Sequence, residues 1–195
     1  MTTKSQKTLS KPQMRALDLA EIALMTALMV AGAFISIPFL PVPLTFQTVI
    51  CCLAGLLLGW KKGGIAMAIY MLMGLVGIPV FSSGARGGIM YVTMPSFGYI
   101  IGFVLAAIAG GLVRGRSAKA PLVRYILAAL TAFVVDYAVG MAYFAIIWTS
   151  LGNSGLGVAM VSYNLIFMPK DIVLCLLGAV LSYKVAPMLL RYRRS

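Results

Sequence analysis

Charge is scarce in this sequence, and acidic side chains are the scarcest of all. The 195 residues contain four Asp or Glu and sixteen Lys or Arg, so only 10% are charged, while 62% are hydrophobic. A soluble domain carries about 25% charged residues, because its surface must face water. The low charge and a mean hydropathy of +1.01 therefore argue against a soluble protein.

Other absences exclude whole classes of chemistry. The sequence has no His, which argues against a His-ligated zinc or haem site. It has no GxxxxGK[ST] phosphate loop, so we expect no ATP hydrolysis by that route. The three cysteines, Cys51, Cys52 and Cys175, fit no metal-binding spacing and are interpreted as small packing residues. Since no nucleophile–base pair can be identified either, we expect neither an enzyme nor a cofactor.

Long uncharged runs are the dominant feature that is present. Residues 22–60, 63–85, 87–113 and 137–169 contain no charged side chain. About 20 apolar residues suffice for a helix to cross a bilayer. We therefore predict an all-α integral membrane protein. Residues 1–15 are polar and basic but lack a small-residue cleavage site, so we expect a cytoplasmic tail rather than a removed signal.

Prolines and glycines divide the apolar sequence into six predicted membrane helices. The prolines of "PFLPVP" end the first helix, and the Gly-rich "SLGNSGLG" precedes the last. Together the helices form one membrane domain. Their expected ranges are 16–37, 44–60, 63–77, 96–113, 121–148 and 169–190.

The basic residues predict the orientation of these helices. In a six-helix arrangement fourteen of the sixteen cations fall on one side, which the positive-inside rule identifies as the cytoplasm. Both termini are then cytoplasmic, in a cell membrane. The net charge of +12 requires no nucleic acid as a partner; it reports topology, with some attraction for anionic lipid. The fourteen are Lys4, Lys7, Lys11, Arg15, Lys61, Lys62, Arg114, Arg116, Lys119, Arg124, Lys184, Arg191, Arg193 and Arg194.

The remaining charges are candidates for a functional site, because ionisable groups within a membrane are costly. A helix beginning at Pro169 places Lys170 and Asp171 at its outward N-terminus, where free N–H groups and an ammonium group suit a carboxylate ligand. Alternatively, Asp171 only caps the helix and Lys170 extends to the headgroups. Arg86 lies in a Gly-rich external loop and is either a ligand contact or a solvated residue. For Asp136 we favour a bond between helices over ligand contact.

A stripe of alanines on the first helix allows close approach of another helix. The stripe includes Ala23 and Ala27, at a spacing that brings helices together in lipid. Packing inside this chain and docking to another protein are both compatible with the pattern.

Four blocks, taken together, resemble the BioY family, the biotin-binding S component of energy-coupling factor vitamin transporters. They are "PVPLTFQT", "GLVGIPVFSSGARGG", "PSFGYIIGF" and "NLIFMPKD", and the likeness extends in order over nearly the whole chain. It implies a six-helix S-component fold that captures a vitamin from outside. A separate coupling subunit and two ATPases would supply energy, with Ala23 and Ala27 on the docking face.

The resemblance also implies ligand contacts. Asp171 would accept from ring N–H groups, and Lys170 or Arg86 would pair with the carboxylate. Asn164 and Gln47 are candidate contacts to a ureido group, and Tyr99 of "PSFGY" is a further candidate.

Two departures leave the ligand open. The family's last helix usually begins Pro-Gly-Asp-x-x-Lys, whereas here the lysine precedes the aspartate and position 174 is Leu. Phe97 replaces a usual glycine. The displaced lysine and Arg86 could hold the same carboxylate from another direction, or indicate another acid such as lipoate or a biotin precursor. A self-sufficient secondary transporter is a further alternative, although no repeated half is apparent.

Overall fold

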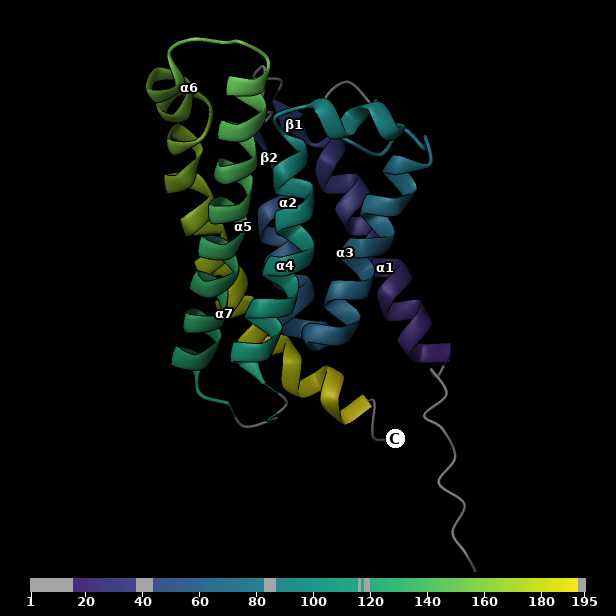
Figure 1. Ribbon diagram of the computed structural model, residues 1–195. Helices are drawn as coiled ribbons and strands as arrows, with labels where there is room; N and C mark the ends of the chain where they lie inside the picture. The colour runs from purple at the N-terminus through teal and green to yellow at the C-terminus, as the bar shows by residue number, and fades with distance from the viewer. Residues whose placement is uncertain (1–15, 38–43, 83–86, 116, 118–119, 193–195) are drawn as a thin grey trace, which may run out of the picture.

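The computed structural model describes residues 16–37, 44–82, 87–115, 117 and 120–192 (Figure 1). Two short strands, β1 (Ser36–Ile37) and β2 (Leu44–Thr45), pair antiparallel. A π-helix, η1 (Ala54–Leu58), joins α2 to α3, and 3-10 turns precede α4 (η2, Ile89–Thr93) and α7 (η3, Leu165–Phe167). The α-helices are α1 (Ala16–Phe34), α2 (Gln47–Leu53), α3 (Gly59–Leu75), α4 (Phe97–Arg114), α5 (Leu122–Ser150), α6 (Leu156–Tyr163) and α7 (Met168–Tyr192).

Five helical segments of the described chain are long and apolar enough to cross a membrane. They are Ala16–Phe34, Gln47–Leu75, Phe97–Arg114, Leu122–Ser150 and Leu156–Leu189. Large apolar side chains also point outward along these segments, among them Leu24, Leu72, Val134 and Leu177, each more than half exposed. An apolar exterior suits a lipid environment and would be a liability in water. The predicted all-helical architecture is thus confirmed.

The second of these segments is a hairpin, because the chain reverses at Gly59. Gly59 has φ 80° and ψ 171°, a backbone conformation that glycine adopts without a steric penalty. After it, α3 returns along η1, so closely that a Cβ at Gly63 would lie 2.7 Å from the carbonyl oxygen of Ala54. We expected the break at Lys61 and Lys62. That expectation was wrong by about two residues, since both lysines lie inside α3.

The structure also adds elements that the sequence did not predict. The stretch between the expected fifth and sixth helices contains α6, which begins directly after Gly155. The chain leaves helical geometry at Asn164 (φ −129°) and resumes in α7. In the connection from α1 to α2, Ser36 pairs with Thr45. That connection was interpreted only as a proline-rich helix stop.

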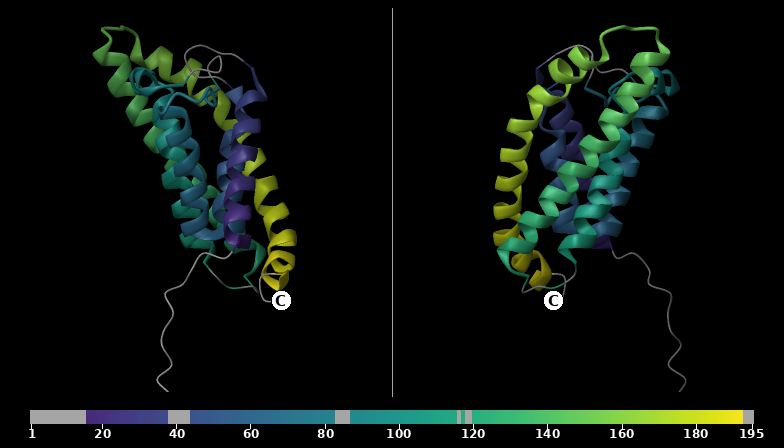
Figure 2. Two further views of the ribbon diagram at one scale, coloured as in Figure 1. Left: turned by 90° about the vertical axis from the view of Figure 1, so that its right-hand side faces the viewer. Right: turned by 60° about the vertical axis from the view of Figure 1, so that its left-hand side comes forward.

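The long helices form one bundle, in which α5 is tilted against α7 (Figure 2), and α6 lies at the opposite end from the C-terminus (Figure 1). Helices α4 and α5 pack most closely, because glycines of α4 face α5. A Cβ at Gly102 would lie 2.4 Å from Oδ1 of Asp136, which leaves no room for a larger residue. On α1, by contrast, Ala23 and Ala27 are exposed. Their stripe therefore does not pack within the described chain.

Candidate substrate-binding site

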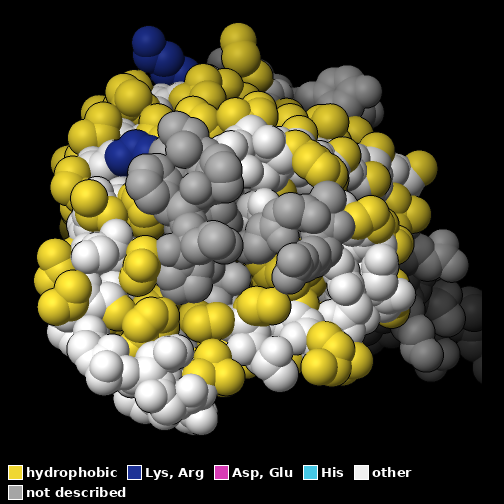
Figure 3. Space-filling view, turned by 90° about the horizontal axis from the view of Figure 1, so that it is seen from above, with side chains coloured by type: hydrophobic (Ala, Val, Ile, Leu, Met, Phe, Trp, Pro, Cys, Tyr) yellow, Lys and Arg dark blue, Asp and Glu magenta, His cyan; other side chains and the backbone are white. Residues whose placement is uncertain are grey.

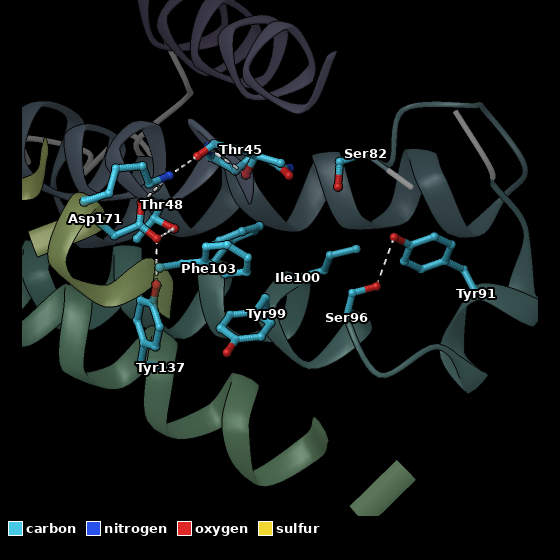
Figure 4. Close-up of a pocket in the computed structure, with 13 residues that line it drawn as sticks. Thr45, Thr48, Ser82, Tyr91, Ser96, Tyr99, Ile100, Phe103, Tyr137 and Asp171 are labelled. Atoms are coloured by element: carbon cyan, nitrogen blue, oxygen red, sulfur yellow. Dashed lines mark hydrogen bonds and ion pairs between the residues drawn. The ribbon is translucent and has the colours of Figure 1, made fainter. Parts of the chain in front are cut away.

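A pocket lies between α2, α4, α5 and the start of α7, at the end of the bundle that carries β1 and β2 (Figure 4). Its residues come from segments far apart in sequence: Thr45, Gln47, Thr48, Ser82, Tyr91, Ser96, Tyr99, Ile100, Phe103, Tyr137, Phe167, Lys170 and Asp171. The free volume is ≈ 50 Å³, below the about 300 Å³ of a small ligand pocket. The pocket as described is therefore narrower than a typical site for a small ligand.

Asp171 is the buried acceptor at one end of this pocket. It lies in the first turn of α7, where unpaired N–H groups and the helix dipole favour negative charge, and it is 6% exposed. Its Oδ2 accepts a hydrogen bond from the Tyr137 hydroxyl at 2.7 Å and a long one from Thr48 Oγ1 at 3.4 Å. The carboxylate is thus held from α2 and α5 at the same time.

The second oxygen of Asp171 is paired but not hydrogen-bonded. Oδ1 lies 2.7 Å from the Lys170 ammonium, yet it accepts no hydrogen bond of acceptable geometry from the described residues. Lys170 Nζ instead donates to the Thr45 carbonyl at 2.6 Å and lies 5.7 Å from the ring centre of Phe46. Lys170 therefore neutralises Asp171 and leaves Oδ1 able to accept an N–H.

Gln47 and Tyr99 line the pocket as predicted contacts, whereas Asn164 does not. Gln47 is 3% exposed and donates from Nε2 to the Tyr70 hydroxyl at 2.7 Å. Asn164 is 1% exposed and accepts from the Tyr99 hydroxyl at 2.5 Å. Asn164 is thus linked to the pocket through Tyr99, and its direct contact with a ligand stays a prediction.

At the other end of the pocket the polar groups are hydroxyls. Tyr91 and Ser96 are hydrogen-bonded to each other at 3.2 Å, and Ser82 lies beside them (Figure 4). Tyr99 and Phe103 lie between this end and Asp171. Sequence reasoning missed Thr48, although the quoted block "PVPLTFQT" contains it; Tyr137 carried no comparable motif.

Charged side chains are few around the pocket. Seen from the β1–β2 end, the described surface shows apolar and uncharged groups with a few cations and no acidic side chain (Figure 3). Arg86, a predicted ligand contact, lies outside the described residues. Asp136 is 1% exposed, is not part of the pocket wall, and neither of its carboxyl oxygens has a hydrogen-bond partner in the described chain. The bond between helices that we favoured for Asp136 is therefore not found there.

Comparison with known proteins identifies the family. The model of the BioY family matches residues 3–191. A probable biotin transporter BioY from Lysinibacillus sphaericus is 40% identical over 77% of this chain and 78% of its own length. The biotin transporter BioY of Rhizobium etli is 33% identical over 86% of this chain and 92% of its own.

A solved structure has the same fold. It is a crystal structure at 2.1 Å of the S-component for biotin from an ECF-type ABC transporter. It aligns with a TM-score of 0.71 and 26% identity, covering 89% of this chain and 94% of the other. Together with the five apolar helices, these relatives indicate a multi-pass membrane protein with a transport role rather than an enzyme. The resemblance inferred from four sequence blocks is thus confirmed: the chain belongs to the BioY family.

Proposed function

We propose that this chain is the substrate-binding membrane subunit of an energy-coupling factor importer and that its ligand is biotin. The observation that carries the proposal is the buried Oδ1 of Asp171, a carboxylate oxygen with a counter-ion but no aligned hydrogen-bond donor. The ureido ring of biotin carries N–H groups that fit such an acceptor. The relatives named as biotin transporters support the same ligand.

Asp171 also discriminates between the candidate acids. Lipoate carries no N–H donor on its ring, so binding lipoate would leave the buried Asp171 oxygen with its Lys170 ion pair but without a hydrogen-bond donor. A pocket of this construction favours a ligand with donors at one end. Apolar and aromatic walls, including Tyr99 and Phe103, would enclose the rest of the ring system.

The carboxylate of biotin then binds away from Lys170. The ammonium group lies 2.7 Å from Asp171, whereas the ureido ring and the carboxylate occupy opposite ends of biotin. One ligand therefore cannot place its ring on Asp171 and its carboxylate on Lys170. We assign the carboxylate to the Tyr91–Ser96 end of the pocket. Arg86 is proposed as its cation, since it follows Ser82 of the pocket wall by four residues.

The topology proposed for this role has six crossings, with both termini in the cytoplasm. The chain reverses at Gly59, so the Gln47–Leu75 segment is proposed to cross the membrane twice, and the five segments then give six crossings. The start of α1 and the end of α7 lie at one end of the bundle, opposite the pocket (Figure 1). The positive-inside rule makes that end cytoplasmic, so the pocket opens outward. The exposed Ala23 and Ala27 are proposed to meet the coupling subunit, which works with two ATPases.

Calorimetric titration of the detergent-purified chain with biotin tests this function. We expect Asp171→Asn to weaken binding about 10- to 100-fold, because a hydrogen bond to a charged group contributes about 1.5–3 kcal/mol. Asp136→Asn is the matched control, an acid changed to an amide behind the pocket wall, and should leave affinity unchanged.

Other outcomes would redirect the proposal. If a folded sample shows no biotin binding, while lipoate or a biotin precursor binds, the ligand is wrong but the role stands. If vesicles containing only this chain take up biotin in response to an ion gradient, the protein is a secondary transporter and the proposed role fails.

A further inference from the structure

A second hollow of this protein lies on its outer surface, between α3 and α4. It has a volume of ≈ 380 Å³, larger than the pocket at Asp171. Its wall is apolar and comes from five residues: Gly64, Ile65, Ala68, Val104 and Ile108. We call it the α3–α4 groove. None of these side chains can hydrogen-bond, so the groove suits a hydrocarbon chain rather than a soluble polar ligand.

One end of the α3–α4 groove is polar, because Trp60 and Lys61 complete its lining. They lie in the first turn of α3, and Lys61 Nζ is 5.1 Å from the ring centre of Trp60. This end of α3 lies at the end of the bundle where α1 begins (Figure 1). Trp beside a cation is typical of the membrane–water interface, where an indole ring reaches the level of the headgroups.

The two neighbouring lysines of α3 have different partners. Lys62 is buried by more than three quarters and pairs with Asp18 at 2.8 Å and with Glu21. Lys61 is exposed and contacts only Trp60 among the interactions found in the described chain. The same turn of helix therefore directs one cation into the protein and the other toward the groove.

Lys61 forms no ion pair with an acidic side chain in the described part of the chain. The chain has four in total, and all four are described. Two of them bind Lys62, Asp171 pairs with Lys170, and Asp136 is buried against Gly102. The exposed ammonium group of Lys61 is therefore accessible to an anionic group from outside the chain.

We propose that the α3–α4 groove binds an anionic phospholipid, with an acyl chain along the apolar wall and the headgroup phosphate at Lys61. Basic hollows between membrane helices have the chemistry that anionic headgroups require. A free phosphate would gain the charge of Lys61 but nothing from the five apolar residues. Lipid is therefore the occupant that uses both parts of the groove, and this site is independent of the substrate.

Native mass spectrometry of the full chain, released from detergent after incubation with a defined lipid, tests the site. The probes are phosphatidylglycerol and phosphatidylcholine with identical acyl chains, each with and without excess inorganic phosphate. We expect about fivefold preferential retention of phosphatidylglycerol, as one lysine near an anionic headgroup provides. Inorganic phosphate should not displace it.

Three variants distinguish lipid binding at the α3–α4 groove from general attraction of anionic lipid to the basic surface. Lys61→Gln should abolish the preference, and Ala68→Leu, which fills the groove, should reduce retention of both lipids. Lys184→Gln, at an exposed lysine of α7, should change neither. Equal retention of the two lipids by the unmodified chain, or an equal effect of Lys61→Gln and Lys184→Gln, would overturn the proposal. So would a protein dimer that excludes lipid. If Ala68→Leu does not fold, Lys61→Gln at its exposed position still decides the question.

Discussion

Changing Tyr137 to Phe tests whether the protein positions Asp171 for its ligand. The change removes one hydroxyl, which donates to Asp171 Oδ2 at 2.7 Å. It keeps the aromatic ring, whose centre lies 4.6 Å from that of Phe133 and 5.7 Å from that of Tyr99. Tyr137→Phe is therefore close to a pure deletion of one hydrogen bond.

The size of the effect follows from the charge and burial of the acceptor. A hydrogen bond to a charged group contributes about 1.5–3 kcal/mol, and Asp171 is 6% exposed, so water cannot replace the lost donor. The remaining donor to Oδ2, Thr48 Oγ1, lies at 3.4 Å and is too long to compensate. Without the Tyr137 hydroxyl the carboxylate is no longer held in place for the ligand. If the binding free energy falls by the same amount, the Kd for biotin should rise about 10- to 100-fold.

The assay is calorimetric titration with biotin, beside Tyr143→Phe as control. Tyr143 lies on the same helix and donates to the Val92 carbonyl at 2.5 Å, so its variant also loses one hydrogen bond. We expect Tyr143→Phe to lower thermal stability while leaving affinity intact. An unchanged Kd for a folded Tyr137→Phe protein, or an equal loss in both variants, would refute the reasoning.

Three further predictions concern stability. Gly102→Ala should lower the free energy of unfolding by about 1–3 kcal/mol, because its Cβ would lie 2.4 Å from Asp136 Oδ1. The control Gly157→Ala has open space around it, so it should leave the melting temperature unchanged in the same thermal melts. Asp136→Asn should be at least as stable as the original chain, since it removes a buried carboxyl group whose oxygens have no hydrogen-bond partner in the described part; a clear loss of stability would contradict this. Lys62→Gln should lower the free energy of unfolding by about 1 kcal/mol, because it removes the two ion pairs that join α3 to α1. Hydrogen exchange in α1 should then become faster, while that in α5 stays constant.

Local properties of the chain were predicted well. The observed α4 and α5 differ from the predicted ranges by a few residues at most. A hydrophobic segment partitions into a membrane according to its own composition, so a window of about 20 residues carries the information. The turn at Gly59 was misplaced by about two residues, because Lys61 and Lys62 looked like the break while the glycine before them made it.

The candidate site was only partly predictable. Asp171 and Lys170 stood out because charge is rare in this chain, and Gln47 and Tyr99 lay within blocks that resemble a family. Tyr137 carried no such signal. Its hydrogen bond to Asp171 spans 34 positions, and no local pattern records which hydroxyl will reach a given carboxylate.

The sequence by itself determined that this protein lies in a membrane, that it is helical, and that it has far fewer acidic than basic side chains. Only the tertiary structure decided which basic side chain pairs with which acidic one. Lys62 pairs with Asp18 and Glu21 of α1, and Lys170 pairs with Asp171, whereas Lys61 forms no ion pair within the described residues. The physical reason is that a charge pair depends on the distance between two side chains and on their burial. Both are set by how the helices pack, and neither can be deduced from the order of residues along one helix.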